Sequence, residues 1–320
     1  MVNIRKCAVI GCGFVGATCA YSLLHSGIFS ELVLIDVNRE KASGEAMDLT
    51  DALPYLSPAS VYAGDYSDIG DCSVVIITAG ANQKPGETRL DLVKKNSAIV
   101  GSIVKEVVKY NTDGILLVVS NPVDILTYVT LKISEFPASR VIGSGTVLDT
   151  ARLKQLVGEH LSVDPRNVHS FVIGEHGDSE LAVWSSANVS GVDLIKFCSI
   201  CGKCGGMQNL YRLFDDVRDS AYKIINTKGA TYYGIAESVR RICEAIVRDE
   251  DSILPVSVLL NGEYDIENIC LGMPSVIGRS GVKRTFEVPL DDYELKKLRA
   301  SADAVRAVIS QLRPDEVPVM

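Results

Sequence analysis

Short apolar runs alternate with longer amphipathic segments along the first half of the chain. The apolar runs predict strands, namely Cys7–Cys12, Glu31–Asp36, Val74–Ala79, Gly114–Ser120 and Val141–Gly143. Between them, Phe14–Ser26 and Arg89–Tyr110 carry apolar residues at helical spacing, which predicts helices. Strands that alternate with helices are joined in parallel by right-handed crossovers. We therefore expect an α/β fold with a doubly wound parallel sheet.

The pattern changes in the second half. The runs Ser252–Leu260, Ile266–Val276 and Thr285–Leu290 are separated by turn signals, which predicts an antiparallel sheet. An amphipathic segment from Asp291 to Leu312 predicts a closing helix. We expect a first domain over residues 1–143 and a second, α+β domain with an antiparallel sheet over residues 144–320.

The composition excludes several classes of protein. Of the 320 residues, 32 are Lys or Arg and 40 are Asp or Glu, which gives a formal net charge of −8. An acidic chain without a basic block has no electrostatic reason to bind nucleic acid or an anionic membrane. No apolar run reaches the roughly 18–20 residues of a membrane span, and residues 1–6 show no signal-peptide pattern, so we expect a cytoplasmic protein.

Cysteines are numerous, and several lie in apparent core segments. Their number, nine, is odd, which favours buried free thiols in a reducing compartment over a disulfide framework. Cys198, Cys201 and Cys204 form a Cys-x2-Cys-x2-Cys run that resembles part of an iron–sulfur motif but lacks a nearby fourth cysteine. We interpret this run as a flexible loop with free thiols that is sensitive to oxidation; a metal-binding or thiol-based function is the alternative.

A glycine motif follows the first predicted strand. Gly11, Gly13 and Gly16 fit Gly-x-Gly-x-x-Gly between a strand and a helix, and Asp36 lies twenty residues further on, at the end of the next strand. In a Rossmann domain such glycines permit a tight turn and the close approach of a pyrophosphate, which the helix N-terminus attracts. A carboxylate at Asp36 would bind the adenosine ribose and repel a 2′-phosphate. The motif therefore predicts NAD rather than NADP; a glycine-rich turn without a ligand is the alternative.

A second cluster of residues predicts chemistry. His176 lies in Gly174-Glu175-His176-Gly177-Asp178, directly after the strand-like run 169–173. Histidine is the side chain whose proton moves near neutral pH. Asp149 and Arg152 are three residues apart, so on a helix they share one face and could orient an imidazole and bind an anion. The alternatives are a core histidine and an Asp149 that caps a helix.

A dinucleotide fold with His, Asp and Arg predicts hydride transfer to a carbonyl whose substrate carries a carboxylate. Over nearly its whole length the chain resembles the lactate/malate dehydrogenase family. The matching segments are GCGFVG, LVLID, ITAGANQKPGETRLDL, VVSNPVDILT, VIGSGTVLDTARL, IGEHGDSE and KGATYYGIA. The resemblance implies an NAD-dependent oxidoreductase that interconverts pyruvate and L-lactate in fermentative metabolism.

The resemblance also implies roles for single residues. His176 would donate a proton to the carbonyl oxygen of pyruvate and accept one from lactate, with Asp149 bound to its other ring nitrogen. Arg152 would hold the substrate carboxylate in a two-pronged salt bridge. Arg89, in a polar stretch with the composition of a mobile lid, would polarise the reacting carbonyl when that loop closes.

Further positions carry over in the same way. Asn121 would bind the substrate oxygen, although a turn role before Pro122 is the alternative. Thr231 would line the wall that faces the substrate side chain, unless it only packs or begins a helix. The remaining positions implied to contact the cofactor are Val15, Lys41, Tyr66, Gly80, Ala81, Ser102, Val119, Asn121 and Ser144.

Gln83 bears on the substrate. Malate dehydrogenases of the family carry Arg at the matching position, where it pairs with a second carboxylate. Gln83 is neutral, and an unpaired carboxylate buried beside it would cost several kcal/mol, so the sequence favours pyruvate over oxaloacetate. Lys84 complicates this argument, and Gly234 and Ile235 leave longer 2-oxo acids open.

Regulation and assembly also follow from the resemblance. Many bacterial members bind fructose 1,6-bisphosphate between subunits through an Arg and a His. His169 matches the His, but Lys154 occupies the Arg position, so we expect weak or absent activation. The resemblance implies a homo-oligomer, expected to be a tetramer. A module that binds NADH without catalysis is the rival hypothesis, which the presence of His176, Arg152 and Arg89 disfavours.

Overall fold

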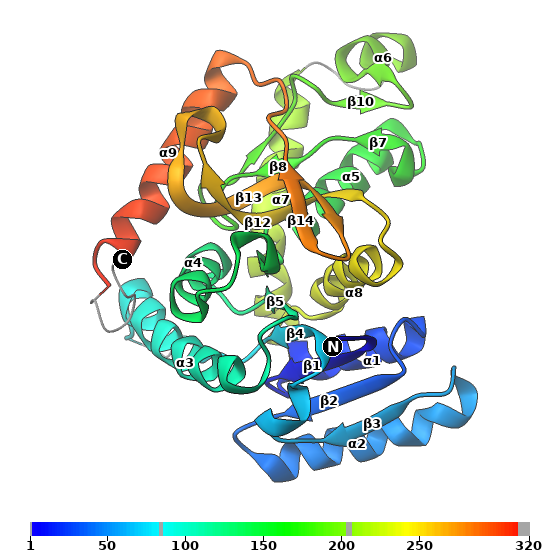
Figure 1. Ribbon diagram of the computed structural model, residues 1–320. Coiled ribbons are helices and arrows are strands. Elements are labelled where there is room, and N and C mark those ends of the chain that lie inside the picture. Colours follow the sequence, from blue (N-terminus) through cyan, green and yellow to red (C-terminus); the bar gives the residue numbers. More distant parts are fainter. Residues whose placement is uncertain (1, 83–85, 203–206, 313–320) are drawn as a thin grey trace.

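The computed structural model describes residues 2–82, 86–202 and 207–312 (Figure 1). Its centre is a nine-stranded sheet in the order β14-β13-β12-β6-β5-β4-β1-β2-β3. The parallel strands of this sheet are β1 (Asn3–Ile10), β2 (Glu31–Ile35), β3 (Ser60–Ala63), β4 (Cys72–Ile77), β5 (Ile115–Val118) and β6 (Val141–Gly143). The predicted α/β, doubly wound parallel sheet is confirmed.

Helices cover both faces of the parallel strands. The helices of the first half are α1 (Phe14–Ser26), α2 (Arg39–Ala52), α3 (Arg89–Tyr110) and α4 (Val123–Ser134). Alternate residues of β1 enter different cores: Val9 packs in one core with residues of α1, and Ala8 packs in the other with residues of α3. Because both faces are covered, the strands have continuous apolar runs rather than an alternating pattern.

Local sequence explains where these helices begin and end. Gly27 closes α1 in the left-handed conformation, with φ of 67°, which glycine adopts without a steric penalty. Thr88 caps α3, because its side chain accepts a hydrogen bond from the backbone N–H of Asp91 while the Asp91 side chain accepts one from the N–H of Thr88. This capping box places Arg89 at the first position of the helix.

Three antiparallel strands extend the parallel sheet, and they are β12 (Ser252–Asn261), β13 (Glu267–Gly278) and β14 (Gly281–Thr285). Ser257 of β12 pairs with Gly143 of β6, so the two halves of the chain share one continuous sheet. The predicted third strand, Thr285–Leu290, is wrong, because pairing begins directly after the tight turn that joins Gly278 and Gly281. Beyond Thr285 the N–H of Phe286 still donates to the carbonyl of Pro274 at 2.8 Å, but the strand ends there, and Pro289 has no N–H to donate.

The second half adds small sheets and helices. The run 169–173, which predicted one strand, is divided between β7 (Val168–His169) and β8 (Val172–Ile173). The other elements are α5 (Val147–Leu161), β9 (Leu181–Ala182), β10 (Asn188–Val189), β11 (Val192–Asp193), α6 (Leu194–Cys201), α7 (Met207–Lys228), α8 (Tyr233–Arg248) and α9 (Asp292–Ile309). Short 3-10 turns lie at Leu53–Tyr55, Tyr66–Ile69, Ala138–Arg140, Pro165–Asn167 and Glu263–Asp265. The edge strand β3 was missed by the sequence analysis, because it is short and only partly buried.

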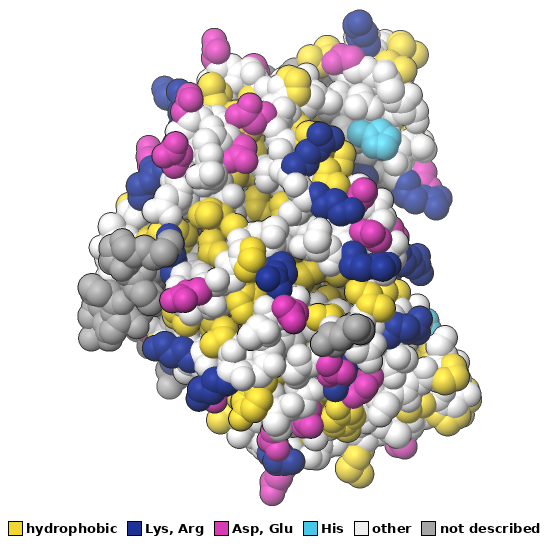
Figure 2. All heavy atoms as spheres, viewed as in Figure 1, with side chains coloured by type: hydrophobic (Ala, Val, Ile, Leu, Met, Phe, Trp, Pro, Cys, Tyr) yellow, Lys and Arg dark blue, Asp and Glu magenta, His cyan; other side chains and the backbone are white. Residues whose placement is uncertain are grey.

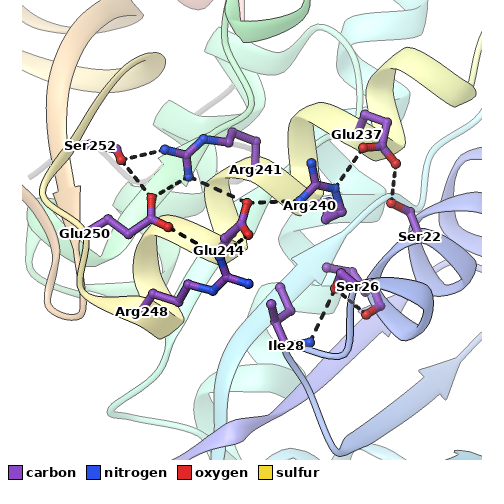
Figure 3. A network of polar contacts seen from close by, with 11 residues as sticks. Ser22, Ser26, Ile28, Glu237, Arg240, Arg241, Glu244, Arg248, Glu250 and Ser252 are labelled. Atoms are coloured by element: carbon purple, nitrogen blue, oxygen red, sulfur yellow. Dashed lines mark hydrogen bonds and ion pairs between the residues drawn. The ribbon is translucent and has the colours of Figure 1, made fainter. Parts of the chain in front are cut away.

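A polar network fastens α8 to the first half of the chain (Figure 3). The Ser22 hydroxyl of α1 donates to Glu237 at 2.7 Å, and Arg240 donates to Glu237 at 2.8 Å and to Glu244 at 3.0 Å. The network continues through Arg241, Arg248, Glu250 and Ser252. Within this network the Ser22–Glu237 bond joins α8 to α1, and the charged pairs link residues of α8 to one another and to the segment that follows it.

On the face shown in Figure 2, acidic and basic side chains are interspersed. None of the described helices is long and apolar enough to cross a membrane.

Seven described cysteines are free thiols: Cys7, Cys12, Cys19, Cys72, Cys201, Cys243 and Cys270. The predicted loop is wrong for Cys198 and Cys201, which lie in helix α6, and the free-thiol interpretation is wrong for Cys198, which is disulfide-bonded. Cys204 lies outside the described residues.

Candidate active site

The carboxyl ends of the parallel strands bring distant segments to one edge of the sheet. Gly11 follows β1, Asp36 follows β2, and Ser144 follows β6. The loops after β4 and β5 contain Gly80, Ala81, Val119 and Asn121. The strand order reverses between β1 and β4, and open α/β sheets bind their ligands in the crevice at such a switch point.

The glycine turn is shaped for the close approach of a ligand. A Cβ on Gly16 would lie 1.8 Å from the Gly11 carbonyl oxygen, so this position accepts no side chain. A Cβ on Gly13 would meet nothing within 4 Å, which leaves the space in front of α1 open. Gly13 caps α1 without a side-chain hydrogen bond, so the free N–H groups of the first turn face that space.

Asp36 completes this edge. Its Oδ2 accepts a hydrogen bond from the backbone N–H of Cys12 at 2.7 Å, and its Oδ1 accepts one from the N–H of Asn38 at 2.9 Å. The carboxylate is therefore held against the glycine turn, where it can meet a ribose. Together the open turn, the helix N-terminus and this carboxylate fit an adenine dinucleotide.

The other positions implied to contact a cofactor lie on several elements of the first half. Val15 lies in the first turn of α1, Lys41 in α2, Tyr66 at the start of a 3-10 turn after β3, and Ser102 in α3. Burial raises the pKa of Tyr66. Asn96 of α3, which was not predicted from the sequence, accepts from the N–H of Ala81 at 2.8 Å and donates to the carbonyl of Asn121 at 2.8 Å. Asn96 could have been identified as an amide side chain on the buried face of an amphipathic helix.

His176 lies in the loop between β8 and β9, and several bonds fix that loop. The N–H of Gly174 donates to the carbonyl of Gly272 at 3.0 Å, and the N–H of Glu175 donates to the Ser301 hydroxyl at 2.8 Å. The backbone N–H of His176 itself donates to Oδ2 of Asp124 at 2.7 Å. The imidazole is therefore carried by a rigid backbone, and Asp124, from α4, is a supporting residue that the sequence analysis missed.

His176, Asp149 and Arg152 form one bonded chain. Nδ1 of His176 lies 2.6 Å from Oδ2 of Asp149, and Arg152 donates to Oδ1 of Asp149 at 2.9 Å. Asp149 and Arg152 share one face of α5, and Asp149 lies inside the first turn of the helix rather than at its cap, which is Thr146. Because Asp149 binds Nδ1, Nε2 is the ring nitrogen left to act on a ligand.

The surroundings of His176 favour its charged form. Burial lowers the pKa of the imidazole, but the Asp149 carboxylate outweighs burial, and Glu180 and Asp124 add to its effect, so the pKa rises to about 9. Burial raises the pKa of Asp149, yet His176 and Arg152 reverse that effect and lower it. Burial also raises the pKa of Asp124, to about 6. At neutral pH the site therefore holds an imidazolium beside a carboxylate.

A cavity of about 340 Å³ opens beside this chain of groups. Its lining residues are Arg89, Leu92, Val93, Asn121, Pro122, Asp149, Arg152, His176, Gly177, Asp178, Glu180, Arg218, Ala221 and Tyr222. Glu180, Arg218 and Tyr222 were not predicted from the sequence. Thr231, between α7 and α8, is not among the described residues that line the cavity, and Gln83 lies outside the described residues.

Arg89 is held at the mouth of the cavity. Its guanidinium group pairs with Glu175 at 2.9 Å and with Asp178 at 3.0 Å, and the Tyr222 hydroxyl donates to Asp178 at 3.2 Å. The Arg89 side chain is 58% exposed, so these bonds form in contact with solvent. Arg89 is thus near the cavity but engaged by two carboxylates.

The two positions implied to bind an effector lie elsewhere. Lys154 is in α5, partly buried, and burial lowers its pKa. His169 is exposed at the end of β7. Neither lines the cavity among the residues that the structure describes.

Known proteins match this chain over nearly its whole length. The model of the lactate/malate dehydrogenase NAD binding domain matches residues 5–143, and that of the alpha/beta C-terminal domain matches residues 146–314. The L-lactate dehydrogenase of Acetivibrio thermocellus is 52% identical over 309 residues, which are 97% of this chain and 98% of the relative. The L-lactate dehydrogenase 1 of Clostridium acetobutylicum is 53% identical over 313 residues, which are 98% of this chain and 100% of the relative.

A solved structure agrees with these sequences. The minor L-lactate dehydrogenase from Enterococcus mundtii in its ligands-bound form superposes with a TM-score of 0.94 at 46% identity, over 97% of this chain and 98% of that chain. The two chains therefore share one fold over nearly their full lengths. The chain belongs to the lactate/malate dehydrogenase family.

Proposed function

We propose that this chain is an NAD-dependent L-lactate dehydrogenase, which interconverts pyruvate and L-lactate. The observation that carries the proposal is the cavity in which His176, bonded to Asp149, lies beside Arg152. Relatives named L-lactate dehydrogenase match this chain at 52% and 53% identity over nearly its full length. NAD(H), when bound, would be held at the glycine turn and would supply or accept the hydride.

The residues of the cavity account for the rest of the reaction. Arg152 presents a planar guanidinium group to the substrate carboxylate and fixes the orientation of pyruvate. His176, protonated at neutral pH, donates the proton on Nε2 to the carbonyl oxygen that becomes the hydroxyl group of lactate. Asp149 keeps the ring oriented through Nδ1 and stabilises its charge. In the reverse direction neutral His176 accepts the hydroxyl proton of lactate.

Arg89 and Asn121 complete the proposed substrate site. Asn121 lines the cavity from the loop after β5, where it can donate to the substrate oxygen. Arg89 reaches the carbonyl only when it leaves Glu175 and Asp178, so a substrate anion must compete for its guanidinium group. Thr231 belongs to the wall that faces the substrate methyl group only if the α7–α8 corner moves toward the cavity.

The preference for pyruvate over oxaloacetate rests on Gln83, because its neutral side chain cannot pair with a second carboxylate. The preference for NAD rests on Asp36, whose carboxylate would repel a 2′-phosphate. We assign residues 1–143 to the cofactor-binding domain and 144–320 to the substrate domain, since β6 ends at Gly143 and the antiparallel strands follow.

Assembly and regulation complete the proposal. We propose a homotetramer with an effector site for fructose 1,6-bisphosphate at Lys154 and His169. Lysine binds phosphate as a single point charge, whereas arginine can bind it through two parallel hydrogen bonds, so activation is expected to be weak. Light scattering tests the tetramer, and rates with and without the bisphosphate test the effector site; an unchanged rate would refute it.

The test of the substrate is a pair of initial rates. Oxidation of NADH is followed with pyruvate and with oxaloacetate at equal concentration. A strong preference for pyruvate is expected. A preference for oxaloacetate would contradict the assignment, and no turnover of either acid would revive the hypothesis of a non-catalytic NADH-binding module.

A further inference from the structure

Glu180 is a buried carboxyl group that the proposed reaction does not use. Its residue is 5% exposed, and its Oε1 has no hydrogen-bond partner among the described residues. Two other buried glutamates differ from it. Glu175 accepts bonds from Arg89 and Ser179, and Glu294 accepts bonds from the backbone of Trp184 and Ser185. An oxygen without a donor costs much more free energy in an ionised carboxylate than in a neutral acid, so the bare Oε1 favours the protonated form of Glu180.

Charged groups of several elements face Glu180. A carboxyl oxygen of Glu180, a carboxylate oxygen of Asp149 and a ring nitrogen of His176 all lie within 4.8 Å of one another. Arg152 of α5 and Arg218 of α7 line the same cavity, but Arg152 donates to Asp149 and Arg218 donates to Asp215. The remaining charged groups of the lining are Arg89 and Asp178. Asp149 therefore opposes a negative charge on Glu180 at close range, and neither Arg152 nor Arg218 donates a bond to Oε1 to offset it.

The titration of Glu180 agrees with this geometry. Burial raises its pKa most, and the Asp149 carboxylate raises it further. His176, Arg152 and Arg218 lower it, and the result is a pKa of about 9. Glu180 thus keeps its proton across the neutral range, in which His176 is also protonated.

We propose that Glu180 is a positioning residue that acts as a neutral carboxylic acid and keeps negative charge away from the place where Arg152 binds the substrate carboxylate. The proposal rests on the proposed function. An ionised Glu180 would repel a bound anion across a low-dielectric cavity and would compete with it for Arg152 and Arg218. Binding of pyruvate therefore requires two protons, one on His176 and one on Glu180.

The test compares Glu180→Gln with the wild type, because the glutamine amide has nearly the shape of the protonated acid and stays neutral at every pH. Initial rates with pyruvate at saturating NADH are measured from about pH 6 to about pH 10.5. At neutral pH the variant is expected to keep kcat and KM within about 2-fold of the wild type. Above about pH 9 the decline of log kcat/KM approaches two per pH unit in the wild type and one in the variant, and the difference lies in KM.

Asp178→Asn is the matched control. It removes an exposed carboxylate from the same cavity, so it is expected to change KM at every pH without changing the limiting slope. Equal slopes in the wild type and Glu180→Gln would overturn the proposal, as would a KM raised about 10-fold or more in the variant at neutral pH. If the variant does not fold, a slope of one in the wild type contradicts the proposal by itself, and a slope of two supports it.

Infrared spectroscopy gives an independent readout. The wild type is expected to show the carbonyl band of a protonated carboxyl at neutral pH, which disappears as the pH rises through about 9 and is missing in Glu180→Gln. A wild type without this band would refute the role of Glu180 alone. A wild type that does not reduce pyruvate would refute the proposed function instead.

Discussion

The glycine turn and the substrate cavity lie at the same edge of the molecule but limit substitution in different ways. In the turn, a Cβ on Gly16 would lie 1.8 Å from a backbone oxygen, so shape decides what the position accepts. In the cavity there is space of about 340 Å³, and charged side chains from several elements decide what enters. Changes in the turn should therefore act on cofactor affinity, and changes in the cavity on protonation and substrate affinity.

The largest effect is expected from His176→Gln. The variant keeps a polar side chain but has no proton to donate near neutral pH, so kcat for pyruvate reduction should fall by about 10²–10⁴-fold. The Kd for NADH, measured by fluorescence titration, should stay within about 2-fold, because Gly11, Gly13 and Gly16 are not among the described residues that line the cavity of His176. A variant that loses both NADH binding and catalysis would contradict the claim that changes in the cavity leave cofactor affinity unchanged.

Arg152→Lys tests the cavity through the substrate. Lysine keeps the positive charge but loses the fork, and one charge-assisted hydrogen bond contributes about 1.5–3 kcal/mol. We expect kcat/KM for pyruvate to fall by about 10–100-fold, with the Kd for NADH unchanged. A lysine variant as active as the wild type would mean that Arg152 only supports Asp149.

Gly16→Ala tests the turn. The added methyl group must displace the Gly11 backbone, which should raise the Kd for NADH about 10-fold and lower the free energy of unfolding by about 1–3 kcal/mol. Gly44→Ala in α2 is the matched control, since a Cβ there meets nothing within 4 Å. An unchanged Kd in Gly16→Ala would mean that the backbone at Gly11 can shift to accept the methyl group without loss of cofactor binding.

Asp178→Asn should have the smallest effect. It removes one of the two carboxylates that hold Arg89, and an exposed ion pair contributes little to stability. The KM for pyruvate is expected to decrease by at most about 3-fold, because Arg89 becomes easier to release. Tyr222→Phe is the control for loss of the neighbouring hydrogen bond, and a rise in KM in Asp178→Asn would mean that the ion pair positions Arg89 for substrate.

The same contrast explains what the sequence could predict. The glycine turn is local, so Gly11, Gly13, Gly16 and Asp36 could be found from spacing alone. The bond from Arg152 to Asp149 follows from helical spacing, but the role of His176 needed the family resemblance. Asp124 could not be found in this way, because it reaches the backbone of His176 from 52 residues away.

The fold shows a similar limit. Periodicity predicted α3 with its observed bounds, because a long amphipathic pattern is distinctive. The third antiparallel strand was displaced by several residues, since a tight turn rather than the apolar pattern sets where pairing begins. Glu180 was missed for a related reason: its lack of a partner is a property of the folded cavity and leaves no mark on the sequence.

The most direct test of the account is the pH dependence of kcat/KM for pyruvate in the wild type and in Asp149→Asn. Asp149 raises the pKa of His176 to about 9, so wild-type activity should persist through neutral pH and decline as the pH rises through about 9. Without that carboxylate, burial would lower the pKa of His176, and the decline should begin at or below about pH 6.5. Identical midpoints in the two proteins would contradict the claim that the His176–Asp149 pair supplies the proton.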